Sequence, residues 1–160
     1  MTENPFPEAL TTVLDGAVID HVGIAVPDLD RAIAFHTGVL GGRLTHRETN
    51  VEQGVEEAMI AFGPTDDAGG PGTQIQLLAP LTPESPIARF IDRSGPGLQQ
   101  LAFRVVDVEK AAAALTAAGL RLLYPEPRRG TADSRINFIH PKDTGGVLVE
   151  LVQPAPVHQG

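Results

Sequence analysis

The chain has 160 residues, of which 42% are hydrophobic and 20% charged, and its net charge is −8. This balance predicts one packed domain or two small fused modules, and it excludes a mainly disordered chain. The acidic charge argues against nucleic-acid binding, which normally needs a basic patch. The chain has no cysteine, so disulfides and cysteine-based metal or redox sites are excluded, and a metal would have to be held by His, Gln, Asp or Glu.

The N-terminal segment does not resemble a targeting sequence. Residues 1–17 have neither a positively charged start nor a sustained apolar run, and no later segment is long and apolar enough to span a bilayer. The sequence therefore predicts a cytoplasmic protein with no membrane partner. Residues 1–15 are expected to be a tail.

The first half of the chain predicts a strand, a helix and three more strands. Residues 19–26 (IDHVGIAV) are typical of a strand that ends at Pro27, and Asp28 offers an N-cap for the helix that follows. Gly38 and the Gly41–Gly42 pair end that helix. Strand-like segments then cover about 43–48, 55–63 and 73–79, so that 16–80 forms a first βαβββ module.

The same order of elements recurs in the second half. Residues 81–97 are expected to be a connector, in which Ser85-Pro86 starts the short helix IARFIDR. The strand LQQLAFRV (98–105) and an Ala-rich helix capped by Asp107 follow. RLLYPEP, SRINFIHP and GVLVELVQ are interpreted as three more strands. A second βαβββ module at 98–153 and a tail at 154–160 complete the chain, which is an internal repeat.

Four polar side chains occupy matching places in this repeat. His21 and Gln100 lie in the first strand of each module, and Gln76 and Glu150 lie in the last strand. Glu150 stands in an apolar run, where an unpaired carboxylate is costly to bury. If the modules face each other, the four side chains surround one point, where a divalent metal would compensate the carboxylate.

Each of these residues also has a simpler interpretation. A histidine in a strand is often a hydrogen-bonded core residue, a strand glutamine is often half-exposed, and Glu150 has Arg104 or Arg135 as candidate ion-pair partners. If the metal interpretation holds, the set contains one imidazole, one carboxylate and two amide oxygens. Such donors suit octahedral Co²⁺, Mn²⁺ or Ni²⁺ better than tetrahedral Zn²⁺, and we expect Co²⁺.

The segments IDHVGIAVPDLDRAI, EQGVEEAM, TQIQLLAPL, LLYPEPRRGT, SRINFIHPKD and GVLVELV resemble the vicinal oxygen chelate (glyoxalase, bleomycin resistance and dioxygenase) superfamily, and within it the methylmalonyl-CoA epimerase family. The resemblance covers about residues 19–153. It implies an α+β fold in which two βαβββ modules form an incomplete, barrel-like mixed sheet around a metal site. It also implies an isomerase that epimerises (2R)- and (2S)-methylmalonyl-CoA by a metal-assisted 1,1-proton transfer at C2.

The resemblance implies roles for five residues. The metal ligands would be His21, Gln76, Gln100 and Glu150, and the catalytic acids would be Glu57 and Glu150. Gln99-Gln100 stands where the family usually has a His-His pair, which predicts weaker metal binding because an amide is a weaker ligand than imidazole. Glu57 shares a strand face with Val55 and Met59, an environment that raises a carboxylate's pKa.

The remaining polar residues suggest where a CoA thioester would bind. Coenzyme A carries phosphates, and a basic cluster in this acidic chain is a candidate partner for them. The candidate substrate-binding residues are Arg128, Arg129, Ser134, Arg135, Asn137 and Lys142. We expect His36, His46, His140 and His158 not to be metal ligands.

Two other functions remain open at this point. One is a glyoxalase-I-like lyase, which a Glu in place of Gln76 would favour. The other is a metal-free small-molecule-binding protein of the same fold, which the 4% aromatic content and the lack of Trp disfavour. Exposed sheet edges in such modules favour a homodimer.

Overall fold

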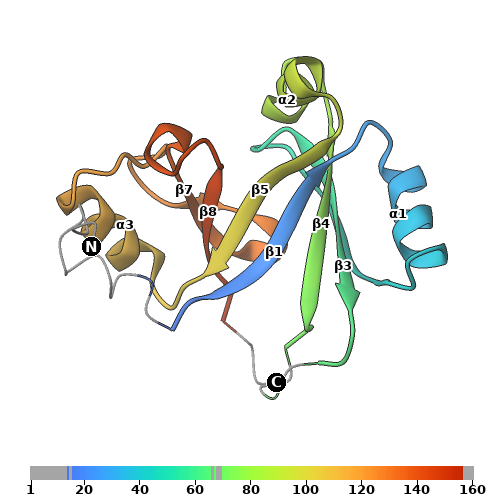
Figure 1. Cartoon of the computed structure of the whole chain (residues 1–160), viewed down its shortest axis with the longest axis horizontal. Helices are drawn as coiled ribbons and strands as arrows, with labels where there is room; N and C mark the ends of the chain where they lie inside the picture. The colour runs from blue at the N-terminus through green and yellow to red at the C-terminus, as the bar shows by residue number, and fades with distance from the viewer. Residues whose placement is uncertain (1–13, 15, 66, 68–69, 157–160) are drawn as a thin grey trace, which may run out of the picture.

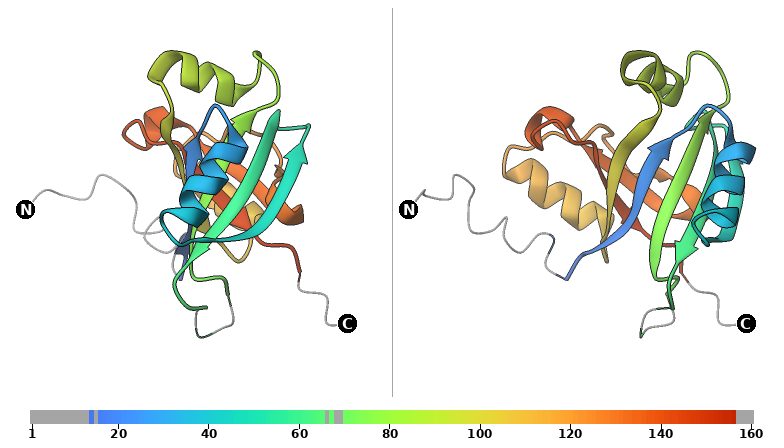
Figure 2. Two further views of the ribbon diagram at one scale, coloured as in Figure 1. Left: turned by 90° about the vertical axis from the view of Figure 1, so that its right-hand side faces the viewer. Right: turned by 45° about the vertical axis from the view of Figure 1, so that its right-hand side comes forward.

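The computed structural model describes residues 14, 16–65, 67 and 70–156, so most of both expected tails lies outside the described residues. Its centre is one mixed sheet with strand order β2-β3-β4-β1-β5-β8-β7-β6, curled into a half-barrel (Figures 1 and 2). This confirms the α+β fold with an incomplete, barrel-like sheet. Among the described residues, no helix has the length and apolar character needed to cross a membrane.

The first module follows the predicted order closely. Its elements are β1 (Val18–Ala25), α1 (Leu29–Gly38), β2 (Arg43–Asn50), β3 (Val55–Phe62) and β4 (Thr73–Pro80). The predicted cap at the start of α1 is present, because the Asp28 side chain accepts a hydrogen bond of 3.0 Å from the Arg31 backbone N–H. One free N–H group at the helix start is satisfied in this way.

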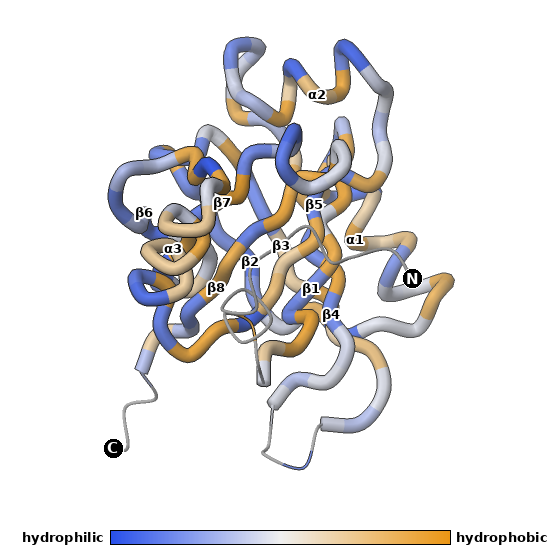
Figure 3. Tube along the Cα trace, turned by 60° about the vertical axis from the view of Figure 1, so that its left-hand side comes forward, coloured by the Kyte–Doolittle hydropathy of each residue, from blue (hydrophilic) through white to orange (hydrophobic). Residues whose placement is uncertain are grey.

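The connector helix and the second module complete the sheet. Their elements are α2 (Pro86–Ser94), β5 (Gly97–Arg104), α3 (Val108–Ala117), β6 (Arg128–Arg129), β7 (Arg135–Ile139) and β8 (Val149–Gln153), with 3₁₀ turns η2 (Thr131–Asp133) and η3 (Pro141–Asp143). Ser85 caps α2 through a 3.1 Å bond from the Ala88 N–H. Figure 3 shows hydrophobic and hydrophilic residues alternating along α2, which rests on the sheet with its buried Ile87.

The prediction that RLLYPEP (121–127) forms a strand is wrong. This segment makes one isolated bridge, between Leu122 and Ile139, and the short strand β6 at Arg128–Arg129 takes the corresponding place in the module. Pro125 and Pro127 lie in this stretch. Because proline has no backbone N–H to donate to a ladder, the segment cannot continue as a paired strand.

The two modules meet at a seam between β1 and β5, which pair antiparallel. On either side of the seam the next strand is parallel to its neighbour: β4 beside β1, and β8 beside β5. Helices α1 and α3 cover the convex flanks (Figure 1), packing on Ala58, Ile60 and Leu77 in one module and on Ile139 and Leu151 in the other. Strand alternation then turns the intervening residues toward the concave side.

Candidate active site

The concave face carries the four predicted ligands in two neighbouring rows. In the first row, Ala102 on β5 lies between His21 on β1 and Glu150 on β8. In the second row, Gly23 on β1 lies between Gln76 on β4 and Gln100 on β5. Each row thus has a small residue between two polar ones. All four polar side chains are buried.

Gly23 is required by this arrangement. A Cβ atom added at Gly23 would lie 2.4 Å from Cγ of Gln100 and 3.0 Å from its Cδ. Any larger residue would therefore push the Gln100 side chain out of the centre. The glycine makes room for the second row.

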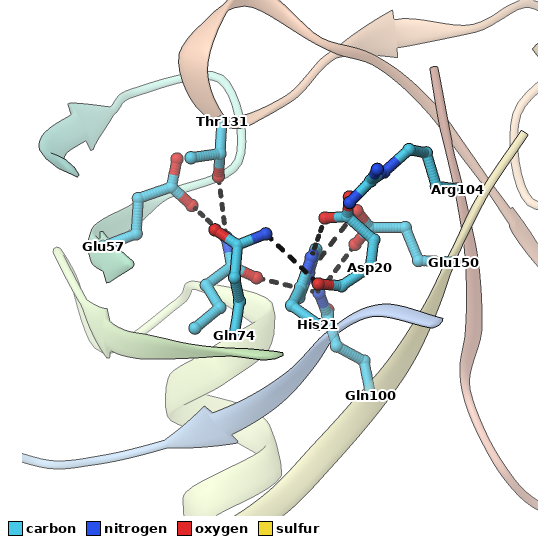
Figure 4. A network of polar contacts seen from close by, with 9 residues as sticks. Asp20, His21, Glu57, Gln74, Gln100, Arg104, Thr131 and Glu150 are labelled. Atoms are coloured by element: carbon cyan, nitrogen blue, oxygen red, sulfur yellow. Dashed lines mark hydrogen bonds and ion pairs between the residues drawn. The ribbon is translucent and has the colours of Figure 1, made fainter. Parts of the chain in front are cut away.

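The other three side chains converge on the Gln100 amide nitrogen, which Figure 4 shows beside His21 and Glu150. Nε2 of Gln100 is 2.6 Å from Oε2 of Glu150, 3.0 Å from Oε1 of Gln76 and 3.3 Å from Nε2 of His21. Three lone-pair atoms therefore surround one positively polarised NH₂ group. Among the described residues no group of three or more His, Cys, Asp or Glu side chains could hold a metal ion, so a metal centre here must include carboxamides.

His21 is oriented by a carboxylate behind it. Its Nδ1 lies 2.7 Å from Oδ2 of Asp20, and Asp20 also accepts a 2.9 Å bond from Nε of Arg104. Burial lowers the pKa of His21, but the bond to Asp20 and the charge of Glu150 outweigh it, and the net shift is upward. In the neutral ring, Nδ1–H donates to Asp20 and the lone pair of Nε2 faces the centre, which is the arrangement found behind metal-bound histidines.

Glu57 approaches the same centre from β3. Its Oε2 accepts a 3.0 Å bond from Nε2 of Gln76, while its Oε1 is buried without a hydrogen-bond partner among the described residues. Burial raises the pKa of Glu57 to about 7, the nearby carboxyl group of Glu48 adds to the increase, and the Thr131 hydroxyl opposes it. A carboxyl group with this pKa is present in both protonation states near neutral pH.

Glu150 is the second carboxyl group with a strongly raised pKa. Burial raises its pKa to about 7, although His21 and the Gln100 amide oppose the shift. The ion-pair partners considered for it from the sequence are engaged elsewhere. Arg104 pairs with Asp20, and Arg135 pairs with Glu109 on α3 at 2.5 Å.

A cavity of about 200 Å³ opens at this centre. It is lined by Glu57, Gln76, Gln100 and Glu150 together with a mainly apolar wall that includes Leu78, Ile87, Leu123, Tyr124 and Phe138. His21 lies on the opposite side, in a second cavity of about 390 Å³ that also reaches Thr131 and Glu150. The centre therefore borders two cavities, the first lined mainly by apolar residues and the second by a mixture of polar and apolar residues.

The candidate substrate-binding residues are dispersed. Arg128 lies with its guanidinium carbon 3.9 Å from the ring centre of Tyr124, a residue that lines the first cavity, and Ser134 lines the second cavity. Asn137 is buried, and its side chain bonds to the backbone of Tyr124. Arg135 and Lys142 are exposed.

Arg129 belongs to a group of contacts between the modules, which we call the clasp, in which Arg129 and Ala132 of the second module bind Glu48 of the first. Its guanidinium lies 2.6 Å from Asp133 and 3.4 Å from Glu48, and Glu48 also accepts a 3.1 Å bond from the Ala132 backbone N–H. Ala132 and Asp133 have left-handed φ values of 53° and 59°. This strained turn brings the Thr131 hydroxyl to 2.7 Å from Nε2 of Gln76.

The other histidines do not join the centre. His36 bonds to the Ala32 backbone oxygen, His46 lies 2.6 Å from Glu48, and His140 accepts from the Lys142 backbone N–H. His158 lies outside the described residues.

Sequence reasoning missed three residues that support the site, namely Asp20, Glu48 and Thr131. A charged residue next to His21 inside an apolar strand was a usable signal for Asp20. Glu48 faces Glu57 across the β2–β3 hairpin, and counting back from the Val51–Gly54 turn would have paired them. Nothing in the local pattern pointed to Thr131, which arrives from the other module.

Comparisons with known proteins relate this chain to a family. The profile of the Glyoxalase/Bleomycin resistance protein/Dioxygenase superfamily matches residues 20–138. The crystal structure of methylmalonyl-CoA epimerase from Mycobacterium tuberculosis is 54% identical and superimposes with a TM-score of 0.80, covering 86% of this chain and 88% of that one.

Two further relatives extend the comparison. A structure of methylmalonyl-CoA epimerase in complex with methylmalonyl-CoA and NH₄⁺ is 45% identical, with a TM-score of 0.81 and coverage of 87% of this chain and 95% of that one. The ethylmalonyl-CoA/methylmalonyl-CoA epimerase of Cereibacter sphaeroides is 36% identical over 137 residues, which are 84% of this chain and 96% of that protein. The chain therefore belongs to the Glyoxalase/Bleomycin resistance protein/Dioxygenase superfamily and, within it, to the methylmalonyl-CoA epimerase family.

Proposed function

We propose that this chain is an epimerase that interconverts (2R)- and (2S)-methylmalonyl-CoA, with Glu57 and Glu150 exchanging the C2 proton. Membership of the epimerase family supports the reaction. The observation that carries the residue assignment is that both carboxyl groups are buried and line one cavity, and burial raises the pKa of Glu57 to about 7. An acid or base works best when its pKa lies near the working pH.

The reaction needs two proton carriers on opposite faces of C2. The C2 hydrogen lies between a thioester carbonyl and a carboxylate, and its removal leaves negative charge on the thioester oxygen. One carboxylate takes the proton from one face while the other, in its acid form, returns a proton to the opposite face. Glu57 on β3 and Glu150 on β8 approach the cavity from opposite modules, which suits this division of work.

Gln76 links the carboxyl group of Glu57 to the amide of Gln100. Its Nε2 donates to Glu57 and to the Thr131 hydroxyl, so both N–H bonds are used and its Oε1 must face Gln100. The same bonds hold Oε2 of Glu57, which leaves its unpartnered Oε1 as the atom that takes and returns the proton. Geometry held in this way limits the reorganisation needed at the moment of transfer.

The residues present fit a divalent cation. Lone pairs of His21, Gln76 and Glu150 converge on a single point, which the Gln100 NH₂ group fills. A cation at this point would require the Gln100 amide to withdraw and turn its oxygen toward the ion, and His21, Gln76, Gln100 and Glu150 would then hold it with one imidazole, one carboxylate and two amide oxygens. When bound there, a divalent ion would stabilise negative charge on the thioester oxygen. We propose Co²⁺, with Mn²⁺ or Ni²⁺ as alternatives, because such donors suit octahedral ions.

The decisive experiment follows deuterium entry at C2 of methylmalonyl-CoA in heavy water. We expect Glu57→Gln to slow exchange by at least about a hundredfold, as is typical for loss of a general base, with cation content unchanged. Glu56→Gln is the matched control, because strand alternation turns Glu56 away from the cavity and only Glu57 is buried. Exchange by Glu57→Gln at the rate of the unmodified protein would remove Glu57 from the mechanism.

We also propose that the protein acts in the cytoplasm as a homodimer. The epimerase of Cereibacter sphaeroides is a bacterial relative, and the outer strand β2 leaves one edge of the sheet without a partner strand among the described residues. Sheet edges of this kind are often covered by association. Light scattering at micromolar concentration would give twice the 16.9 kDa chain mass if the dimer forms.

A further inference from the structure

Unsatisfied polar atoms are concentrated in one cavity. Four buried side-chain atoms have no hydrogen-bond partner among the described residues: Nδ2 of Asn50, Nε2 of Gln53, Oε1 of Glu57 and Oε1 of Gln99. All four residues line the cavity of about 200 Å³ beside the centre. Buried polar atoms are nearly always paired, because an unpaired one loses its hydrogen bonds to water without replacement. Glu57 has a proposed role, so the other three need an explanation.

The two amide donors are held with their nitrogens free. Asn50 ends β2 and is 2% exposed, and its Oδ1 accepts a 3.0 Å bond from the Gln53 backbone N–H across the turn. Oε1 of Gln53 lies 3.3 Å from the Tyr124 hydroxyl, which donates to it. Since both carbonyl oxygens are used, the NH₂ groups of Asn50 and Gln53 are two oriented donors without acceptors.

Gln99 faces the same cavity because of a β-bulge. The register of β1 and β5 shifts between Gly23, paired with Gln100, and Ile24, paired with Leu98. Gln99 is therefore the extra residue of β5 and escapes strict alternation, so that both it and Gln100 line the cavity. Its free Oε1 is an acceptor without a donor.

Two free donors and one free acceptor are complementary to a secondary amide, whose C=O accepts and whose N–H donates. The lining residues include no Arg, Lys or His among the described part of the chain, so a neutral group suits the wall better than an anion does. We propose that Asn50, Gln53 and Gln99 bind the amide of the CoA arm nearest the thioester. This inference rests on the proposed function.

The distance along the cavity agrees with this placement. Asn50 pairs with Val55, which lies two residues before Glu57 on β3, a separation of about 7 Å along a strand. In the substrate, the thioester carbonyl carbon, the sulfur and two methylene groups separate C2 from the first amide, which also gives about 7 Å in an extended chain. With C2 at Glu57, the amide therefore lies beside Asn50.

Two substrates that differ only at this amide test the inference. Methylmalonyl-N-acetylcysteamine retains the amide, whereas the ethyl thioester of methylmalonate lacks it. The variants are Gln53→Met and Gln99→Met, which keep the side-chain length, and Asn50→Ser, which keeps an oxygen to accept from Gln53. We expect kcat/KM for C2 exchange of the N-acetylcysteamine thioester to fall roughly ten- to a hundredfold, and that of the ethyl thioester to change less than about threefold. Glu56→Gln, whose side chain turns away from the cavity, is the control and should leave both rates unchanged within about twofold.

The outcomes separate this inference from the proposed function. If the unmodified protein exchanges neither thioester nor methylmalonyl-CoA, the proposed function fails. If it exchanges them and folded variants lose equally on both thioesters, the three residues bind the acyl carboxylate and the amide subsite is refuted; no loss on either thioester refutes it as well. Should Asn50→Ser lose its cooperative unfolding transition, Gln53→Met and Gln99→Met decide, since neither removes the oxygen that caps the turn.

Discussion

Nε2 of Gln100 lies 2.6 Å from Oε2 of Glu150, so the amide neutralises part of the charge that a cation would otherwise meet. This contact stabilises the centre when no metal is bound, because the buried carboxylate of Glu150 then accepts a hydrogen bond from the Gln100 amide. It also means that a metal must displace a good hydrogen bond in order to bind. Gln100 is therefore the one residue of the four whose hydrogen-bond donor faces the place of a cation, and substitution of Gln100 tests its effect on cation binding.

Gln100→His should strengthen cation binding. An imidazole nitrogen is a better metal ligand than an amide oxygen. An imidazole also cannot donate hydrogen bonds from one nitrogen to both Glu150 and Gln76, as the NH₂ group of Gln100 does. We expect Co²⁺ affinity, measured by calorimetric titration at pH 7.5, to rise by about tenfold, which is about 1.4 kcal/mol. Gln100→Ala, which removes the donor and adds no ligand, is the comparison. Equal affinity in the histidine variant and the unmodified protein would show that Gln100 is not next to the ion.

Asp20→Asn should weaken cation binding although Asp20 does not face the centre. The carboxylate fixes the Nδ1–H tautomer of His21, and loss of such an outer partner usually costs about ten- to a hundredfold in metal affinity. Asp30→Asn is the matched control, since Asp30 is exposed on α1 and pairs only with Arg47 among the ion pairs of the described residues. The same titration should show no change for that control, and an undiminished affinity in Asp20→Asn would remove it from the site.

Glu57 should make the protein less stable as the pH rises. Its pKa is 4.5 in the ordinary state and about 7 in the folded protein, so the folded state binds the proton more tightly. The resulting stabilisation is complete below about pH 4.5 and is lost as pH passes 7. The shift corresponds to about 3 kcal/mol at most.

Urea unfolding in the presence of a chelator tests this dependence. At pH 8.5, Glu57→Gln should be more stable than the unmodified protein by about 2–3 kcal/mol, because the neutral amide has no charge to bury. At pH 5 the two should agree closely. Glu56→Gln should match the unmodified protein at both pH values, and a Glu57→Gln variant that is less stable at pH 8.5 would contradict the assignment.

Ala132→Gly should stabilise the clasp between the modules. Ala132 has φ 53° and ψ 41°, a left-handed conformation that costs an L-residue about 1–2 kcal/mol and glycine almost nothing. The backbone N–H that Glu48 accepts is retained, so we expect a gain of about 1 kcal/mol in urea unfolding. Ala113→Gly, on the exposed side of α3, should instead lose about 1 kcal/mol. Destabilisation in both variants would mean that the turn is not strained.

Much of the site was predictable because it depends on alternation within repeated strands. His21 and Glu150 occupy equivalent apolar strands, and the repeat alone placed them in facing modules. The reduction of 121–127 to one isolated bridge follows from Pro125 and Pro127, and these prolines were visible in the sequence although their effect on pairing was missed.

Other features depend on contacts between distant residues. The bulge that turns Gln99 inward arises from a register shift against β1, which no pattern within β5 reveals. The left-handed turn at Ala132 is held by Glu48, 84 positions earlier, and neither residue type favours such a turn by itself. Local periodicity describes strands and helices, but it does not report these long-range bonds.

The antiparallel seam between β1 and β5 has a consequence for how the protein assembles. Each module supplies two of the four inward-facing side chains, so neither half possesses a complete coordination shell before docking. Occupancy of the shell is consequently a property of the joined chain, and ligation must favour the docked state over separated halves by mass action. A bound cation would therefore stabilise the association of the two modules and raise the free energy needed to separate β1 from β5.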